Sequence, residues 1–344
     1  MRNTLVGYQT GVNLGGWISQ FREANKQHFD TFITEKDIAQ IASWGMDHVR
    51  LPIDYTVIED DNRPYCYKEA GFAYIDQCIS WCEANNLNII LDLHRTPGYA
   101  FHSLMENRLF EEEALQERFL DIWRTFAKRY LRYGRNVVFE LLNEIVENNS
   151  DRWNKLSKRA ITAIREIDTE RVIILGGNNY NSVNTLAQLD YIEDDKLVYT
   201  FHFYEPHIFT HQKASWEPLM KELNYTVPYP SGTEDYHRYR KQSEDFRRHY
   251  HFEEKTGKDY IRTCLQPALN FIKERNVPVY CGEYGVIDHT PLEYNLRWHE
   301  DVCDLMIEYG IGRAVWTYKQ MSFPMVNMES AVRDERLIKI VSKK

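Results

Sequence analysis

Eight short apolar runs recur along the chain, and segments with helical periodicity lie between them. The runs are rich in β-branched and aromatic residues, and several are unbroken by polar residues, which is typical of strands buried on both faces. They lie at 11–14, 48–52, 88–94, 137–143, 172–177, 198–204, 278–283 and 313–318. Eight alternations of strand and helix predict an α/β fold of the (β/α)8 type, the TIM barrel.

A doubly wound sheet is the alternative arrangement for alternating strands and helices. Sheets of that kind that bind dinucleotides carry a G-x-G-x-x-G turn, and this sequence contains none. Gly176 and Gly177 are followed by Asn178 and Asn179, which indicates a turn rather than a phosphate-binding loop. The barrel is therefore the preferred prediction.

The predicted helices are amphipathic. Thr34 and Asp37 are suited to cap a helix that begins at Glu35 and runs to Trp44. Apolar stripes with helical spacing occupy positions 75, 78, 79 and 82 and positions 119, 122, 126 and 130, as expected for helices that pack on a sheet. Further helices are expected near 152–167, 260–275 and 292–309.

One connection is much longer than the others. Some 55 residues separate Tyr204 from Asp259, whereas such loops usually have about 2–6 residues. The segment 205–259 is polar and aromatic, so we predict a helical subdomain inserted after the sixth strand, with at least one helix near EDFRRHYHFEE (244–254). We expect residues 1–344 to form a single catalytic domain that carries this insertion beside its active face.

Composition narrows the class of ligand. The net charge of −9 disfavours a nucleic-acid partner, because phosphate binding requires an excess of Lys and Arg. Aromatic residues make up 14% of the chain, which suits a large core or a surface that stacks on sugars. We expect a neutral ligand, a monomer and no membrane partner, since no run is long and apolar enough to span a bilayer.

The six cysteines are expected to be free thiols. The sequence contains no C-x-x-C pair, which disfavours a zinc ribbon or a redox pair. Cys78 and Cys82 fall on one face of a predicted helix and read as core residues. Free thiols fit a reducing compartment, and no apolar run of signal-peptide length is visible at the N-terminus. We therefore expect a cytoplasmic protein, or a secreted one from which a leader has been removed.

Polar or ring-bearing side chains lie at the carboxyl ends of six predicted strands. In a TIM barrel these ends form the active face. The side chains are Arg50, His94, Asn143, Glu144, His202, Tyr204, Glu283 and Trp316. Each alone is compatible with a structural role, such as a salt bridge or a core ring, but their coincidence at one end of the barrel favours a functional site.

Two of these side chains form a candidate catalytic pair. Glu144 ends the fourth strand and Glu283 the seventh, and these strands face each other across a barrel mouth. Retaining glycosidases use two carboxyl groups about 5–5.5 Å apart. One must be protonated to donate to the leaving oxygen, and the other must be ionised to attack the anomeric carbon. Their mutual repulsion can raise the pKa of one and leave the other low.

The neighbouring side chains have roles beside such a pair. Arg50 can bind a carboxylate through its guanidinium fork and keep Glu283 ionised. Asn143 can bond the sugar 2-hydroxyl, a contact that strengthens in the transition state. Trp316 offers a flat apolar face to a pyranose. In the insertion, Trp216 is the best candidate for stacking on sugar, with anchoring to the barrel as the alternative.

Seven motifs occur in order over nearly the whole chain: NLGGW (13–17), DHVRLP (47–52), LDLH (91–94), LLNE (141–144), FHFY (201–204), CGEYGV (281–286) and AVWTY (314–318). Together they resemble glycoside hydrolase family 5, the cellulase family, and most closely its bacterial endoglucanase C type. The resemblance implies a TIM barrel that acts on β-linked glucans, with β-1,4 or mixed β-1,3/1,4 linkages, by a retaining reaction without a metal or other cofactor.

The resemblance also implies roles for individual residues. It makes Glu144 the general acid/base and Glu283 the nucleophile. The family's other active-site positions are matched by Arg50, His94, Asn143, His202, Tyr204 and Trp316. Arg95 departs from the pattern, because many relatives carry a second histidine there, and this bears on the minus-side subsites.

Other enzyme classes fit the sequence less well. A metal-dependent hydrolase could use His202, His207 and His211, but the spacing H-x4-H-x3-H without a nearby Asp matches zinc sites poorly. A cysteine nucleophile is also conceivable, because Cys281 lies two residues before Glu283 and on the same face of the strand. It lacks an evident triad.

Two further alternatives share the carbohydrate ligand. A β-mannanase or glucomannanase would use the same fold, since mannose differs from glucose only in its axial 2-hydroxyl. A non-catalytic carbohydrate-binding barrel would use the same cleft, but the paired carboxylates at 144 and 283 favour an enzyme.

Overall fold

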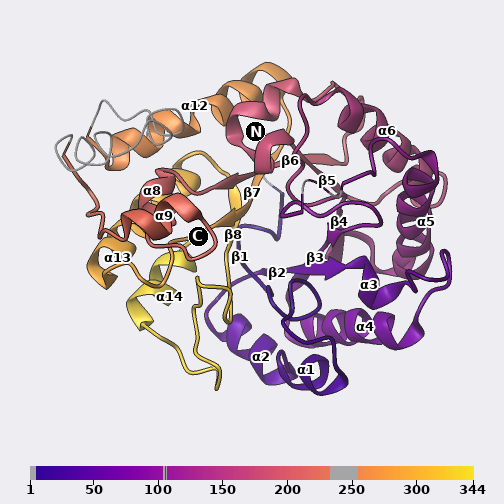
Figure 1. Cartoon of the computed structure of the whole chain (residues 1–344), viewed down its shortest axis with the longest axis horizontal. Coiled ribbons are helices and arrows are strands. Elements are labelled where there is room, and N and C mark those ends of the chain that lie inside the picture. The colour runs from indigo at the N-terminus through magenta and orange to yellow at the C-terminus, as the bar shows by residue number, and fades with distance from the viewer. Residues whose placement is uncertain (1–4, 104, 106, 233–254) are drawn as a thin grey trace.

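The computed structural model describes residues 5–103, 105, 107–232 and 255–344. Eight parallel strands form a closed barrel in chain order (Figure 1). They are β1 (Thr10–Asn13), β2 (His48–Asp54), β3 (Asn88–Arg95), β4 (Val137–Glu140), β5 (Ile173–Gly176), β6 (Leu197–Phe203), β7 (Val279–Tyr284) and β8 (Gly312–Val315). Each lies on one of the eight predicted runs, so the TIM barrel prediction is confirmed.

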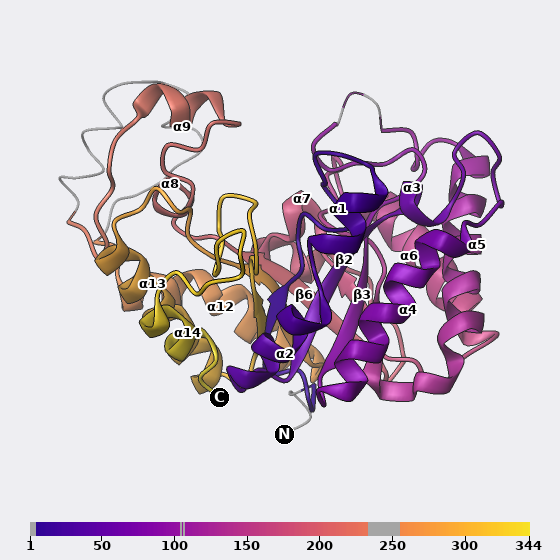
Figure 2. The ribbon, with the colours of Figure 1, turned by 90° about the horizontal axis from the view of Figure 1, so that it is seen from below.

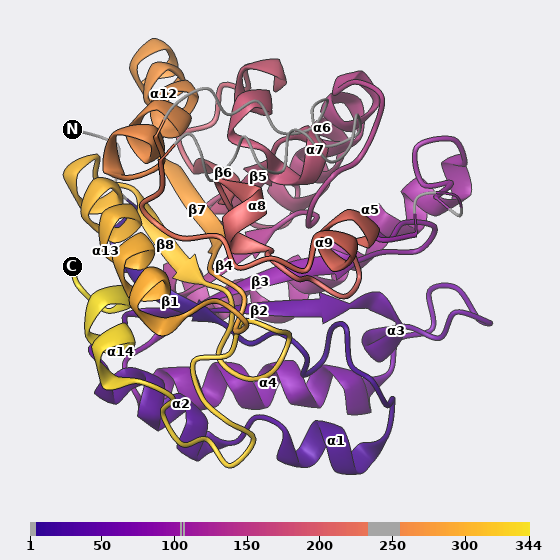
Figure 3. The same cartoon turned by 60° about the vertical axis from the view of Figure 1, so that its left-hand side comes forward.

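Helices surround the barrel and line its rim. The α-helices are α1 (Lys26–Thr31), α2 (Glu35–Ser43), α3 (Tyr55–Ile58), α4 (Glu69–Ala84), α5 (Glu113–Tyr130), α6 (Asp151–Arg165), α7 (Asn178–Asn181), α8 (His207–Thr210), α9 (Pro218–Leu223), α12 (Lys258–Arg275), α13 (Leu292–Glu308) and α14 (Glu335–Val341). Two 3-10 helices, η2 (Leu131–Asn136) and η3 (Val183–Gln188), join them. On the outer side of β8, α13 packs beside α14 (Figure 3).

The local signals predicted for the helices are present. Asp37 accepts hydrogen bonds from the backbone N–H and the hydroxyl of Thr34 at 2.8 and 2.7 Å, completing a capping box at α2. The predicted stripes of α4 and α5 are buried. The six cysteines are free, and Cys78 and Cys82 are buried in α4. Among the described residues, no helix has the length and apolar character required to cross a membrane.

Two strands end three residues earlier than predicted. β4 ends at Glu140 rather than Asn143, and β8 ends at Val315 rather than Tyr318. Beyond β4 the chain keeps only single bonds to its neighbours, from Leu141 N–H to the Ile174 carbonyl and from Asn143 N–H to the Leu93 carbonyl. The residues that follow the strands are therefore free to turn into the mouth.

The barrel interior changes from apolar to charged along its axis. Because successive side chains alternate between the two faces of a strand, positions 90, 92 and 94 of β3 share the inner face. A buried apolar cluster that includes Ile90, Val138, Val198 and Tyr280 fills the end nearer the strand starts. Two residues further along β3, β4 and β6, the inward positions are the polar residues Asp92, Glu140 and Thr200, which lead toward the mouth.

The described part of the insertion rises from the active end of the barrel. α8 and α9 stand beyond that end, on the opposite side from the two chain termini (Figure 2). The helix predicted near 244–254 lies outside the described residues. α8 and α9 are both short, so the helical character of the remaining insertion stays a prediction.

Candidate active site

Arg50 is the centre of the site. It is fully buried in β2. Its Nε and Nη2 atoms donate to the two oxygens of Glu140 at 2.7 and 2.9 Å, and Nη2 lies 3.0 Å from Oδ2 of Asp92. Two donors on one carboxylate fix the plane of the guanidinium. Glu140 and Asp92 are not among the residues predicted from the sequence.

The same guanidinium reaches the mouth. Its Nη1 atom donates to Oε1 of Glu283 at 2.8 Å and to Oδ1 of Asn13 at 2.9 Å. Its Nη2 atom donates to Oδ1 of Asn143 at 2.9 Å. One buried cation on β2 therefore contacts side chains from β1, β3, β4 and β7, and it brings Arg50, Asn143 and Glu283 together as predicted.

The guanidinium of Arg50 forms ion pairs with three buried carboxyl groups. Burial raises the pKa of Asp92 to about 7 although the charge of Arg50 lowers it, and burial likewise raises the pKa of Glu140. Burial opposes the charge of Arg50, but Asp92, Glu140 and Glu283 together raise the pKa of Arg50 well above its ordinary value. Arg50 therefore stays charged, and any proton in this group of side chains is carried by a carboxyl group rather than by the guanidinium.

Both oxygens of Glu283 accept hydrogen bonds. Besides the bond from Arg50, the hydroxyl of Tyr204 donates to Oε2 at 2.9 Å. Burial raises the pKa of Glu283, and the permanent charge of Arg50 opposes that rise. Donors on both oxygens favour the ionised form, so Glu283 is equipped to act as a carboxylate.

Glu144 is equipped to hold a proton. Burial raises the pKa of Glu144 to about 8, against the lowering effect of Arg50. Asn181 Nδ2 lies 3.3 Å from Nε2 of His202 and donates to it, so Nδ1 carries the proton that His202 donates to Oε1 of Glu144 at 2.8 Å. Burial lowers the pKa of His202 to about 4, so its ring is neutral near pH 7. The acid proton of Glu144 then belongs on the other oxygen.

The two carboxyl groups are close neighbours. One oxygen of Glu144, one oxygen of Glu283 and one ring nitrogen of His202 all lie within 4.8 Å of one another. This group has the residue types of a metal site, but Arg50 and Tyr204 already donate to both oxygens of Glu283. The cation beside Glu283 disfavours a second one, so the group is better suited to acid/base and nucleophilic chemistry.

The backbone at Glu144 is held in an unusual conformation. Its φ angle is 44°, in the left-handed region that is costly for a residue with a Cβ atom. The hydroxyl of Tyr99 donates to the Glu144 carbonyl at 2.8 Å and accepts from the Val146 N–H at 2.7 Å. Tyr99, which the sequence did not point to, thus holds the turn that directs Glu144 into the mouth.

Asn143 keeps an unused donor in the site. Its Oδ1 atom is taken by Arg50, and its buried Nδ2 atom has no hydrogen-bond acceptor among the described residues. A buried N–H group without a partner is costly. A hydroxyl of a bound sugar would satisfy it, which matches the role expected for Asn143.

His94 and Trp316 form one wall of the site. Their rings stack with centroids 5.8 Å apart and an interplanar angle of 6°. His94 Nδ1 lies 2.6 Å from Oδ2 of Asp92, and Nε2 lies 3.1 Å from Oε1 of Gln20. Trp316 is only 6% exposed, and its predicted role as a flat face for a pyranose stays a prediction.

A row of rings leads from the site to the insertion. Tyr204 contacts His211 and Phe323, with centroids 5.0 and 5.8 Å apart. Both of these rings contact Trp216, at 6.2 and 6.4 Å. Trp216 is 52% exposed, so it packs on the rings below and still presents an open face. Its predicted role in sugar binding stays a prediction.

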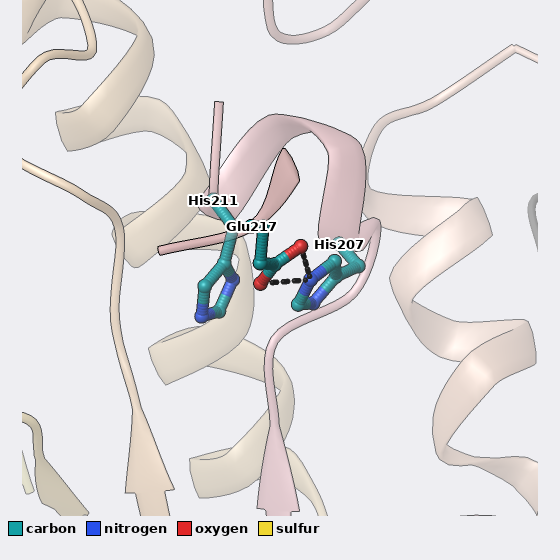
Figure 4. Close-up of side chains that lie close together, drawn as sticks. All are labelled: His207, His211 and Glu217. Atoms are coloured by element: carbon teal, nitrogen blue, oxygen red, sulfur yellow. Dashed lines mark hydrogen bonds and ion pairs between the residues drawn. The ribbon is translucent and has the colours of Figure 1, made fainter. Parts of the chain in front are cut away.

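The rival active sites do not assemble. His202 lies with Glu144 and Glu283, whereas His207 and His211 form a separate group with Glu217 (Figure 4). Burial raises the pKa of the Cys281 thiol well above its ordinary value, and this thiol donates to the Glu283 carbonyl at 3.2 Å. A neutral, buried thiol is not a nucleophile.

Arg95, which departs from the family pattern, stands at the rim. Its Nη1 atom lies 3.6 Å from Oδ2 of Asp54, and its side chain is partly exposed. Asp54 also accepts hydrogen bonds from Ser19 and from the Gln20 backbone. Arg95 thus belongs to a polar group beside His94, on the side of the mouth formed by β2 and β3.

Comparisons with known proteins agree with this geometry. The profile of the family described as Cellulase (glycosyl hydrolase family 5) matches residues 8–322. Endoglucanase C of Acetivibrio thermocellus is 46% identical over 99% of both chains. Cellodextrinase A of Ruminococcus flavefaciens is 34% identical over 98% of this chain and 94% of its own. Among solved structures, endoglucanase Cel5A of Thermotoga maritima superposes with a TM-score of 0.80 at 24% identity, covering 99% of this chain and 98% of the other.

Proposed function

Because the chain belongs to glycosyl hydrolase family 5 and is a glycoside hydrolase of the endoglucanase type, we propose that it cleaves β-1,4-glucosidic bonds with retention of configuration. The substrates are cellulose-type glucans or mixed-linkage β-1,3/1,4-glucans. Glu283 is the nucleophile and Glu144 the general acid/base. This proposal is supported above all by the contrast between two neighbouring carboxyl groups. Arg50 and Tyr204 donate to the two oxygens of Glu283, which favours its ionised form, whereas burial raises the pKa of Glu144 to about 8.

In the first step, a carboxylate oxygen of Glu283 attacks the anomeric carbon. The glycosidic C–O bond breaks, and Glu144 transfers its proton to the leaving oxygen. The sugar remains joined to Glu283 as a glycosyl ester, and Glu144 is left as a carboxylate. Arg50 and Tyr204, which donate to Glu283 in the free enzyme, orient the attacking group.

In the second step, a water molecule replaces the departed sugar. Glu144 removes a proton from this water, whose oxygen attacks the anomeric carbon and displaces Glu283. Two inversions at one carbon give overall retention. The Nδ2 atom of Asn143, which lacks an acceptor within the described chain, bonds the 2-hydroxyl, where a contact strengthens as the transition state forms.

The spacing of the pair supports retention over inversion. Inverting enzymes keep their carboxyl groups about 6.5–9.5 Å apart to admit a water between them, whereas retaining enzymes keep them about 5–5.5 Å apart. One oxygen of Glu144 lies within 4.8 Å of one oxygen of Glu283, which is closer to the spacing of retaining enzymes than to that of inverting ones.

The names of the relatives bear on the size of the substrate. One relative is named an endoglucanase and another a cellodextrinase, so both polymers and short oligosaccharides are reasonable substrates. Carboxymethylcellulose, barley β-glucan, glucomannan, mannan and laminarin, compared by product size, distinguish the linkages. If mannan were hydrolysed fastest, the β-mannanase alternative would replace the glucanase proposal.

The stereochemical outcome tests the mechanism. Proton NMR during the hydrolysis of cellotetraose should show the newly formed reducing end in the β configuration at early times, before mutarotation. An α product at early times would contradict the role given to Glu283.

A further inference from the structure

A second group of ionisable side chains lies at the base of the insertion. His207 opens α8, His211 follows that helix, and Glu217 precedes α9. Residues four apart on a helical turn lie on the same side, so the two imidazoles are neighbours. The chain between His211 and Glu217 folds back and brings the carboxylate to them (Figure 4).

The three side chains converge closely. Nε2 of His207 lies 2.9 and 3.0 Å from the two oxygens of Glu217. The rings of His207 and His211 stack, with centroids 4.0 Å apart and an interplanar angle of 17°. One potential ligand atom from each residue falls within 4.8 Å of the others. All three side chains are partly exposed, so an ion can reach them from solvent.

Two imidazoles and one carboxylate form a ligand set that zinc uses in proteins. Zinc bonds of about 2.0–2.2 Å place tetrahedral ligand atoms about 3.4 Å apart. Because the two rings are nearly parallel, one imidazole must rotate for both to direct a nitrogen at a common ion. The bond between His207 and Glu217 already brings two of the ligands within that spacing, and an ion would take the place of the shared proton.

Neighbouring groups hold the second imidazole in place. The Thr210 hydroxyl lies 3.0 Å from Nδ1 of His211, and the His211 ring packs against the rings of Tyr204 and Phe323. Contacts of this kind orient the ligands of metal sites and limit their motion.

We propose that His207, His211 and Glu217 bind one divalent transition-metal ion, with Zn²⁺ the best fit. Water completes the coordination. The ion joins the end of α8 to the start of α9 across the loop that carries Trp216, so it fixes the base of the insertion. It takes no part in the reaction, because Tyr204 separates His211 from Glu283. The proposal is independent of the substrate assigned above.

The site is tested by metal binding in the full chain. The purified protein is stripped with a chelator, dialysed and titrated with Zn²⁺ in the presence of a chromogenic competitor. The variants are Glu217→Gln and His207→Gln. The control is His289→Gln, which removes an exposed histidine 3.7 Å from Asp288. Melting of each stripped variant shows whether it is folded.

We expect about one equivalent of Zn²⁺ to bind the wild type and the control, with affinity reduced about tenfold or more in both site variants, since each loses a direct ligand. Zn²⁺ should raise the melting temperature of the wild type and of His289→Gln but not of Glu217→Gln. Co²⁺ bound at the same place should give visible absorption bands that Glu217→Gln removes.

One further variant distinguishes this site from the catalytic pair. Zn²⁺ held by Glu144, His202 and Glu283 would be lost in Glu144→Gln, whereas Zn²⁺ at the proposed site would be kept. Binding that survives in Glu217→Gln and His207→Gln, binding that is lost only in Glu144→Gln, or no binding by the wild type would each overturn the proposal.

Discussion

The barrel mouth and the base of the insertion are both rich in histidine and carboxylate, but they are built differently. At the mouth, Arg50 is fully buried, and Asn143 and Glu283 are also buried. Arg50 and Glu283 lie on strands, Asn143 follows β4, and hydrogen bonds from Arg50 hold the other two in place. At the insertion, His207, His211 and Glu217 are partly exposed and are held by short helices and stacked rings.

This difference separates two tasks. Reaction at an anomeric carbon requires two carboxyl groups with different protonation, and burial beside one permanent cation provides that difference. Contact with a long, varied glucan requires an open surface, and Trp216 presents one. Substitutions at the mouth should therefore change turnover, and those at the insertion should change the dependence on substrate length.

The largest effect is expected from removing the nucleophile. Glu283→Ala should lower turnover by about 10³-fold or more, because no other group can form the glycosyl ester. Azide should restore part of the activity and give a glycosyl azide of inverted configuration. Rates on cellotetraose with and without azide measure this. Turnover near the wild-type value would place the nucleophile elsewhere.

A selective loss is expected at the acid. Glu144→Gln should lower polymer cleavage by about 10²–10⁴-fold, while glycosylation by an activated aryl cellobioside, whose leaving group needs no proton, should suffer much less. In the wild type, kcat/KM should fall as pH rises through about 8, where Glu144 loses its proton. Glu144→Gln should abolish this basic limb. Equal losses on both substrates would give Glu144 a merely structural role.

A smaller effect is expected at the cation. Arg50→Lys keeps the charge but cannot donate to Glu140, Asn143 and Glu283 together, so turnover should fall by about 10²-fold. Loss of the bond to Glu283 should raise the pKa of that carboxyl, and the acid limb of the pH profile should move to higher pH.

A buried arginine outside the mouth provides the control for Arg50→Lys. Arg171 bonds to Asp168 and to main-chain carbonyls, so Arg171→Lys should lower the melting temperature without moving the acid limb. An unchanged acid limb in Arg50→Lys would remove Arg50 from the control of Glu283.

The smallest effect is expected at the insertion. Trp216→Ala should raise KM for long oligosaccharides by about two- to tenfold, in line with one stacking contact, with little change for short ones and an unchanged melting temperature. Tyr191→Ala, which removes an exposed ring that precedes β6 and thus lies away from the mouth, should change neither. A lower melting temperature with equal effects on all substrates would make Trp216 an anchor.

Much of the fold and part of the site could be predicted from the sequence. Eight buried strands leave continuous apolar runs, so the runs located the strands and the polar residues within them, such as Arg50 and Glu283. The strand ends were less exact, because β2 continues beyond Arg50 to Asp54. β4 was predicted to run to Asn143, because Leu141 and Leu142 extend its apolar run although the ladder bonds stop. The turn at Glu144, held by Tyr99, has no local sequence signature.

Two residues of the mouth, Asp92 and Glu140, were missed because they lie inside the predicted strands rather than at their ends. Asp92 lies two residues before His94, and Glu140 lies four before Glu144. Both follow the two-residue alternation that brings side chains to one face, so that alternation could have indicated Asp92. The approach of Glu217 to His207 and His211 depends on how a loop folds back, which residue spacing does not record.

The division of roles between the two carboxyl groups is tested most directly by trapping the intermediate. Wild-type protein is incubated with a 2-fluoro cellobioside that has an activated leaving group, which forms the glycosyl ester but hydrolyses it slowly. The intact mass should rise by one fluorinated cellobiosyl unit, and peptide mapping should place the added mass on Glu283. An adduct on Glu144, or inactivation without any adduct on Glu283, would contradict the account.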